Sequence, residues 1–335
     1  MWIRATGSAV CGWNERGTAQ VFAAGRAYGS ALRAMSAEAR RLGLILRVES
    51  GRTRAGLTTS QITLFLGKDR VCGLRLLNVS RIARAAIVMD DLGRDLGSAR
   101  VLLSLHAPLT FSVMPGQRDS RQLAEAAHRA GVEVMLHLPM QPIDDSAPDI
   151  SPHELRVGMS DREVERLVLH DLATVPDAAG VNNHMGSRAT ADGKLMAEVM
   201  SVLAKRRLYF IDSRTSPDSV ALAAARRAGL RAFYRSVFLD DVRTVRYTLG
   251  QLRLLSRLAQ ERGAVLAIGH PYPSTLAALR LFLPELYRED VQLVPVSQLL
   301  RSPEVARLSP PRSPSGLSGN TGRRRDYLAP ARANF

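Results

Sequence analysis

Ionisable side chains recur at the ends of short apolar runs in the central part of this sequence. Asp90 and Asp91 end the run AAIVMD. His137 ends the run VEVMLH, and His184 and His270 follow two later runs. Imidazole nitrogen and carboxylate oxygen are ligands that suit zinc and related divalent ions, and three such ligands leave one coordination position for water. These residue types therefore indicate a hydrolytic metal site, because a water bound there loses a proton near neutral pH.

Hydrolysis at such a site also needs groups that move protons. A carboxylate beside the metal ligands can act as a general base, and a histidine on the opposite side can protonate the leaving group. The pair Asp90 and Asp91, with the three histidines, is sufficient for these roles. Neighbouring strand residues point to opposite faces, so both carboxylates reach one site only where the strand gives way to a loop. Gly93, which follows closely, favours such a break.

Short apolar runs alternate with helical periods over residues 82–300, which predicts an α/β fold. Strands that are apolar throughout and separated by helices indicate a parallel sheet. Seven or eight such units in about 220 residues favour a closed or distorted (β/α) barrel, whose active site lies at the C-terminal ends of the strands. The strands are predicted at 85–90, 109–114, 132–137, 179–183, 208–212, 231–234, 264–269 and 291–295.

The two flanks differ from this region, and three parts of the chain are predicted. Residues 1–81 are expected to form either a small α+β appendage, with a helix over 20–42 and strands at 44–48 and 61–66, or a poorly ordered leader. Residues 82–300 would form the barrel. Residues 301–335 are rich in Pro, Ser, Gly and Arg, and such a composition predicts a disordered basic tail.

The net charge of +15 is unevenly distributed along the chain. Lys and Arg outnumber Asp and Glu by 12 to 4 in residues 1–80 and by 7 to 2 in 301–335, but only by 27 to 25 in 81–300. A nucleic-acid enzyme would carry its basic groove in the folded domain, and no nucleic-acid recognition motif is present. We therefore expect no specific nucleic-acid partner, and only a weak association of the flanks with anionic surfaces.

The compartment does not follow from the sequence. Cys11 and Cys72 are too few for a disulfide framework. No run of 18 apolar residues is present, so no transmembrane segment is expected. The charged residues Arg4, Glu15 and Arg16 interrupt any apolar core of a secretory signal near the N-terminus.

Five segments of the sequence carry a resemblance to a known family. They are IVMDDLG (87–93), GVEVMLHLPMQP (131–142), GVNNHMGSRAT (180–190), YFIDSRT (209–215) and IGHPYP (268–273). These segments resemble motifs of the divergent polysaccharide deacetylase family, a branch of the carbohydrate esterase-like polysaccharide deacetylase superfamily. The resemblance implies a distorted (β/α) barrel, a divalent metal with zinc expected first, and an acetylated polysaccharide or peptidoglycan-type substrate. It also implies the periplasm or cell envelope as the location.

The resemblance also implies roles for individual residues at the start of the barrel. Asp90 matches the catalytic base and Asp91 the first metal ligand. His137 matches the first histidine of a motif that has two histidines four residues apart, but Gln141 stands in the second position. We propose His184, from the NNHMGS segment, as the replacement ligand.

The remaining motif residues have less definite roles. His270 resembles the late histidine that assists the leaving group. Asn183, Arg188, Asp212 and Arg214 lie in the same segments and are candidates for contacting substrate or for orienting a ligand histidine through its second nitrogen.

Three functions follow from these patterns. The first is a metal-dependent hydrolase that removes an N-acetyl or related acyl group from a glycan. The second is a deacetylase-like module with lost or altered chemistry, which binds glycan or a partner protein, and Gln141 is the feature that favours it. The third, which is weaker, is a binder of anionic surfaces through the basic flanks.

Overall fold

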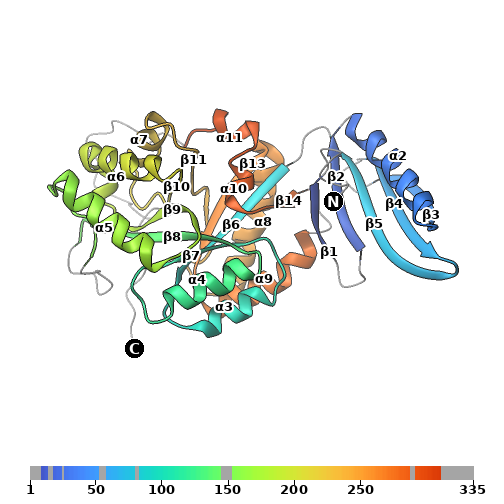
Figure 1. Cartoon of the computed structure of the whole chain (residues 1–335), viewed down its shortest axis with the longest axis horizontal. Helices are drawn as coiled ribbons and strands as arrows, with labels where there is room; N and C mark the ends of the chain where they lie inside the picture. Colours follow the sequence, from blue (N-terminus) through green and yellow to red (C-terminus); the bar gives the residue numbers. More distant parts are fainter. Residues whose placement is uncertain are drawn as a thin grey trace.

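The strands of this chain form two separate sheets (Figure 1). The computed structural model describes residues 9–13, 18–24, 26–52, 58–79, 83–144, 153–286 and 291–310. We call residues 9–79 the small unit and residues 83–310 the large unit.

The small unit is a five-stranded sheet with one helix packed on it. The strand order is β1-β2-β5-β4-β3, and β2 and β5 run parallel. An apolar core that includes Met35, Ile62 and Leu76 lies between the helix and the sheet. Of the two alternatives that the sequence left open, the described residues form the α+β appendage, but its helix begins at Arg26 and not at residue 20, because residues 18–24 form a strand. The elements are β1 (Ala9–Trp13), β2 (Thr18–Ala24), α2 (Arg26–Arg41), β3 (Ile45–Arg52), β4 (Thr58–Leu66) and β5 (Asp69–Val79).

The large unit contains a sheet in which every paired strand is parallel, which confirms the predicted α/β class and distorted (β/α) barrel. The order is β11-β10-β9-β8-β7-β6-β13-β12, and β14 also pairs with β6. All eight predicted strands are present, and β12 is a two-residue addition. The strands are β6 (Ala83–Leu92), β7 (Thr110–Val113), β8 (Glu133–Met140), β9 (Ala178–Met185), β10 (Tyr209–Asp212), β11 (Ala232–Tyr234), β12 (Val237–Phe238), β13 (Ala264–Gly269) and β14 (Val291–Leu293).

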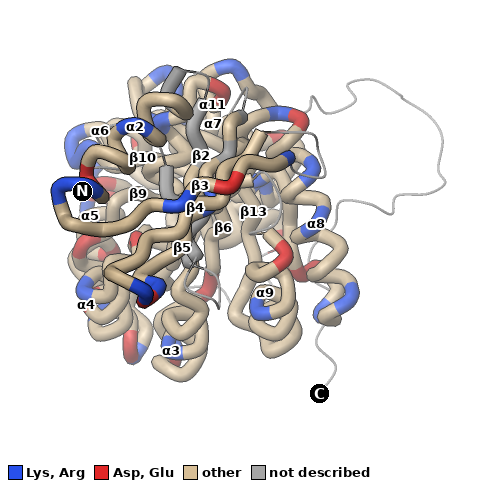
Figure 2. The backbone as a smooth tube through the Cα atoms, turned by 90° about the vertical axis from the view of Figure 1, so that its right-hand side faces the viewer, with Lys and Arg blue, Asp and Glu red and all other residues tan. Residues whose placement is uncertain are grey.

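Helices surround this sheet, as the view along the long axis shows (Figure 2). Local signals in the sequence set their ends: the Ser160 hydroxyl and the Glu163 side chain form a capping box that starts α5, and Gly263, at φ 87°, ends α8. The main helices are α3 (Leu96–Leu103), α4 (Ser120–Arg129), α5 (Asp161–Thr174), α6 (Gly193–Lys205), α7 (Ala221–Arg227), α8 (Val245–Arg262) and α9 (Pro273–Leu286).

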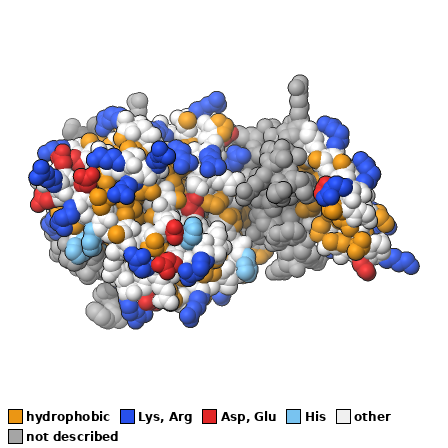
Figure 3. Space-filling model, viewed as in Figure 1, with side chains coloured by type: hydrophobic (Ala, Val, Ile, Leu, Met, Phe, Trp, Pro, Cys, Tyr) orange, Lys and Arg blue, Asp and Glu red, His pale blue; other side chains and the backbone are white. Residues whose placement is uncertain are grey.

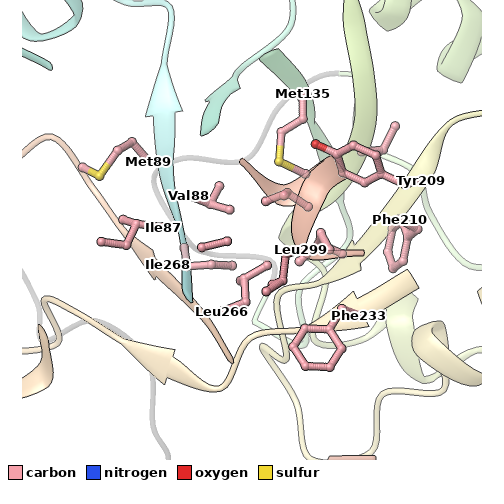
Figure 4. Close-up of a cluster of buried hydrophobic side chains, with 14 of the residues drawn as sticks. Ile87, Val88, Met89, Met135, Tyr209, Phe210, Phe233, Leu266, Ile268 and Leu299 are labelled. Carbon is pink, nitrogen blue, oxygen red and sulfur yellow. The ribbon is translucent and has the colours of Figure 1, made fainter. Parts of the chain in front are cut away.

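The core of the large unit is built from strands that are buried on both faces. Ile87 and Val88 of β6 lie beside Leu266 and Ile268 of β13, and Phe233 of β11 belongs to the same cluster (Figure 4). Burial of this kind contributes about 1.5–3 kcal/mol for each large apolar side chain. The polar groups of these strands are therefore confined to their ends, where they are available for a site.

The large unit continues beyond the predicted boundary at residue 300. Residues 301–310, assigned from composition to a disordered tail, include the short helix α11 (Pro303–Arg307), in which Val305 is buried. The Arg226 guanidinium donates hydrogen bonds to the Val305 and Leu308 carbonyls, and the Tyr234 hydroxyl donates to the Ser309 carbonyl. The rest of the predicted tail lies outside the described residues. Within those residues, no helix is long and apolar enough to span a bilayer.

Candidate metal centre

The five residues that the sequence singled out for chemistry come together at the C-terminal ends of neighbouring strands. Asp90 and Asp91 end β6, His137 lies in β8, His184 lies in β9, and His270 directly follows β13. The strand order places β9 beside β8, and β13 beside β6. Parallel pairing puts all of these strand ends on one edge of the sheet, where a barrel carries its active site.

Asp90 and Asp91 both reach the site because β6 is irregular at this point. The pairing of β6 with β7 shifts register between Met89 and Leu92, and Asp91 has φ 58°. This left-handed conformation costs about 1–2 kcal/mol for a residue with a side chain, and such strain is concentrated at functional sites. Gly93 follows at φ 119°, where an added Cβ would lie 3.0 Å from the Ser120 hydroxyl oxygen. The break in the strand that the sequence required is therefore present.

Three potential metal-ligand atoms form a nearly equilateral triangle. Asp91 Oδ1 lies 3.3 Å from His137 Nε2 and 3.2 Å from His184 Nδ1. The two imidazole nitrogens are also 3.2 Å apart. Tetrahedral coordination with bonds of about 2.0–2.1 Å separates ligand atoms by roughly 3.3 Å. The triangle thus has the dimensions of one face of a tetrahedral zinc site, and these three residues could hold a metal ion.

The Asp91 carboxylate is ionised in this environment. Burial raises its pKa, but the close imidazoles of His137 and His184 and the positive charge of nearby histidines lower it more, so the pKa lies well below its usual range. Its Oδ1 atom is buried without a hydrogen-bond partner of good geometry, and the same is true of His184 Nε2. A buried anionic oxygen that lacks a donor is an expected property of a cation site, because such an atom is costly to leave unpaired.

Asn182, which the sequence analysis did not select, fixes the orientation of His137. Its Nδ2 donates to both Asp90 oxygens, at 2.9 and 3.2 Å, so its Oδ1 must face the other way. That Oδ1 lies 3.0 Å from His137 Nδ1 and accepts a hydrogen bond from the Ser112 hydroxyl. Since an amide oxygen can only accept, His137 Nδ1 carries a proton, and Nε2 is the ring nitrogen that remains to bind a metal ion.

His270 is held by a second residue that the sequence analysis missed. The buried Asp240 carboxylate accepts hydrogen bonds from the His270 backbone nitrogen, from His270 Nδ1 and from the Thr275 hydroxyl. His270 Nε2 faces the triad, 3.7 Å from Asp91 Oδ2. Burial lowers the pKa of His270, but the hydrogen bond to Asp240 and the charges of Asp91 and Asp240 outweigh it and raise that pKa to about 9.

Aromatic rings line the mouth of the site beside His270. The His270 ring contacts Phe238 edge-on and Tyr272 at a tilt, in both cases with 5.4 Å between ring centroids. The Arg243 guanidinium lies 4.0 Å above the Tyr272 ring and also donates to its hydroxyl. This stack presents an aromatic and cationic edge next to the proposed proton donor.

Gln141, which stands at the position of the second motif histidine, forms hydrogen bonds to two loops beside the site. Its side-chain oxygen accepts a hydrogen bond from the Val157 backbone nitrogen, and its carbonyl accepts from the Arg188 and Ala189 nitrogens. The residue therefore joins the loops that follow β8 and β9. His184, from the neighbouring strand, places its Nδ1 at the third corner of the triangle.

Of the four further residues predicted near the site, Asn183 and Asp212 hold its loops through their side chains. Asn183 donates to the Met185 carbonyl and accepts from the Ser213 nitrogen. Asp212 accepts from the Arg214 nitrogen and the Ser219 hydroxyl, and burial raises its pKa. Arg188 is exposed. Among the described hydrogen bonds, it is Asn182, and none of these four residues, that orients the candidate ligand His137. A contact between the four residues and a substrate stays a prediction.

Fold and site together define a distorted (β/α) barrel with an Asp-His-His cluster at its catalytic edge. A family model described as divergent polysaccharide deacetylase matches residues 87–300, and the chain belongs to this family. It is 36% identical over 230 residues to the uncharacterized protein YibQ of Escherichia coli K12, covering 69% of this chain and 71% of that protein.

Two other comparisons concern a second relative and a solved structure. An uncharacterized protein of Haemophilus influenzae is 37% identical over 223 residues, covering 67% of this chain and 79% of its own length. The crystal structure of the uncharacterized protein ATU2773 from Agrobacterium tumefaciens C58 matches with a TM-score of 0.62 and 24% identity, covering 65% of this chain and 89% of that one. The last similarity shows a shared fold.

Proposed function

We propose that this chain is a metal-dependent hydrolase that removes an N-acetyl or related acyl group from a polysaccharide of the cell envelope. The observation that carries the proposal is the triangle formed by Asp91, His137 and His184, with edges of 3.2–3.3 Å and a buried carboxylate oxygen that lacks a donor. Family membership supports a glycan substrate, of which peptidoglycan is one type, and a location in the cell envelope or periplasm.

The donor set suits a divalent ion, with zinc as the first candidate. Two neutral imidazoles and one carboxylate are a common catalytic zinc set that leaves a position open. An ion held there would activate water and polarise an acyl carbonyl. Asn182 supports this assignment, because its hydrogen bond to His137 Nδ1 keeps Nε2 directed at the triangle.

The proton transfers are assigned to residues of the chain on either side of the triad. Asp90, whose Oδ2 lies 3.5 Å from His137 Nε2, accepts a proton from the attacking water. His270 donates a proton to the nitrogen of the departing amine as the carbon–nitrogen bond breaks, because its Nδ1 is bound to Asp240 and its Nε2 faces the site. The products are a carboxylate and a free amine.

A second candidate function is a deacetylase-fold module that binds glycan or a partner protein without hydrolysis. The specific observation in its favour is Gln141, which occupies the second histidine position of the superfamily motif and hydrogen-bonds a loop. This function requires no ion at the triad, so metal content separates the two candidates.

The decisive experiment is elemental analysis of the purified full-length chain after exposure to zinc, together with its Asp91→Ala and His184→Ala variants. The matched control is His128→Ala, since His128 is an exposed histidine on α4. We expect about one ion per chain in the parent and the control, and loss of the ion in both site variants. Release of acetate from N-acetylated glycan oligomers by the parent, but not by the site variants, would complete the test. A parent that retains no metal would favour the binding module.

A further inference from the structure

We propose that one end of the small unit binds the surface of a membrane that contains anionic lipids. This end, called the apolar tip below, is formed where α2 ends, β3 begins and the β4–β5 hairpin turns. Its apolar side chains are Leu42, Ile45, Leu66 and Val71. The surface lies in a different sheet from the metal centre, so the proposal does not depend on the hydrolase function.

The tip residues are exposed to an unusual degree for large apolar side chains. The exposed fractions are 51% for Leu42, 52% for Ile45, 60% for Leu66 and 55% for Val71. With Val48, these make up five of the nine exposed large hydrophobic residues in the described chain, although the small unit is much the smaller part. Scattered exposed apolar residues are normal, but a concentrated set marks an interaction surface.

Strand register brings these residues to a single end of the sheet. Ile45 pairs with Phe65 at the end of β4, and Leu66 pairs with Asp69 across the hairpin. The chain turn between α2 and β3, which carries Leu42, lies at this same end, since the Leu44 nitrogen donates to the last turn of the helix. The buried core of the small unit is formed by other residues.

The tip lies on the outer part of the small unit. In Figure 1, β1 and β2 lie between the large unit and the strands β5, β4 and β3, and the hairpin points away from the large unit. Figure 3 shows hydrophobic side chains gathered beside Lys and Arg on this outer part. A flat surface can therefore approach the tip without meeting the large unit first.

Charge identifies the partner as anionic. Residues 26–52 and 58–79 contain nine Lys or Arg and three Asp or Glu. The basic residues on the segments that build the tip are Arg40, Arg41, Arg47, Lys68 and Arg70. The Arg47 guanidinium also lies over the Phe65 ring at 4.9 Å, so cationic and apolar groups are interleaved.

A membrane surface uses both the charge and the apolar side chains of the tip. Nucleic acid or a soluble polyanion would bind the cations but gain little from exposed Leu, Ile and Val. Anionic headgroups attract each nearby Lys or Arg by about 1 kcal/mol, and apolar side chains can enter the boundary between headgroups and acyl chains. A bilayer surface therefore matches the composition of the tip.

The test is co-sedimentation of the full-length chain with vesicles of phosphatidylcholine alone or mixed with phosphatidylglycerol. We expect binding to the mixed vesicles that weakens as salt is raised. A variant with Leu42→Ser, Ile45→Ser, Leu66→Ser and Val71→Ser should bind the mixed vesicles at least about tenfold more weakly than the parent. The matched control is Leu281→Ser on α9, which removes an equally exposed leucine (60%) of the large unit and should change nothing.

Each alternative has its own outcome. Because multiple substitutions can unfold a small unit, the charge reversals Arg40→Glu and Lys68→Glu are measured separately, and each should weaken binding to the mixed vesicles. Equal binding of the parent and the four-serine variant would show that charge alone acts and would overturn the proposal. The proposal would also be overturned if the parent bound neither kind of vesicle but formed a dimer in analytical ultracentrifugation, and if the four-serine variant were monomeric.

Discussion

The His270 imidazole donates from Nδ1 to the buried carboxylate of Asp240, across 3.0 Å. The same carboxylate also accepts from the His270 backbone nitrogen. Ring and backbone of the histidine are thus fixed by one residue that lies 30 positions earlier in the chain. The imidazole nitrogen that remains free can point only toward the triad.

The pair predicts how hydrolysis depends on pH. A proton donor acts only while protonated, so the rate should fall as pH rises through the His270 pKa of about 9. Asp240→Asn removes the charge that raises this pKa, and the fall should move to lower pH. The measurement is kcat against pH for acetate release. Asp241→Asn is the matched control, because that neighbouring carboxylate accepts a hydrogen bond from the Tyr247 hydroxyl. An equal shift of the pH profile in both variants would contradict the role of Asp240.

The same shift predicts a pH-dependent stability of the metal-free chain. The pKa of His270 rises from 6.5 to about 9 on folding, so the folded state binds the extra proton more tightly. This contribution is fully present below pH 6.5 and is lost as pH rises through about 9. Urea unfolding of the parent and of His270→Gln should therefore differ more at the acidic end of this window. A difference that grows with pH would show the opposite linkage.

Asn182 should affect metal affinity without being a ligand. Asn182→Ala removes the acceptor that sets the His137 tautomer and the donor to Asp90, and loss of such an outer partner typically costs 10–100-fold in affinity. Zinc titration calorimetry measures the loss, and nitrogen-15 NMR of the metal-free chain reports the tautomer. Asn183→Ala is the control, since that side chain contacts backbone groups and Thr215. If Asn182→Ala kept both the parental His137 tautomer and the parental zinc affinity, Asn182 would have no role in orienting His137.

Restoring the superfamily histidine should not improve the site. Gln141→His removes the hydrogen bond to the Val157 nitrogen, which we expect to lower the free energy of unfolding by about 1 kcal/mol. Metal content should stay at the parental level because His184 already supplies the third ligand atom. Urea unfolding and elemental analysis test the two statements. Tighter zinc binding in Gln141→His would show that the position still faces the ion.

The sequence predicted the strands and the five central site residues because both are local signals. Apolar runs mark buried strands, and a charged residue at the end of such a run is conspicuous. Asn182 could not be found in this way, since alternation along a strand gives two equivalent choices, and the sequence analysis selected Asn183. The register that places Asn182 opposite His137 is a property of two strands together.

Asp240 was missed for a different reason. It follows β12, which is only two residues long and has no recognisable periodicity. The irregularity of β6 was anticipated only as a requirement of the chemistry. Its actual form, a register shift combined with a left-handed Asp91, depends on the pairing partner β7.

The three candidate ligand residues stand far apart in the chain, at positions 91, 137 and 184, and come from three strands of one sheet. An unfolded chain cannot gather them, so an ion would bind the assembled sheet almost exclusively. Under that condition each tenfold increase in free ion above the dissociation constant adds about 1.4 kcal/mol to the free energy of unfolding. Thermal melting against ion concentration would then measure the affinity of the site for an ion, and it requires neither a substrate nor knowledge of which glycan the protein meets.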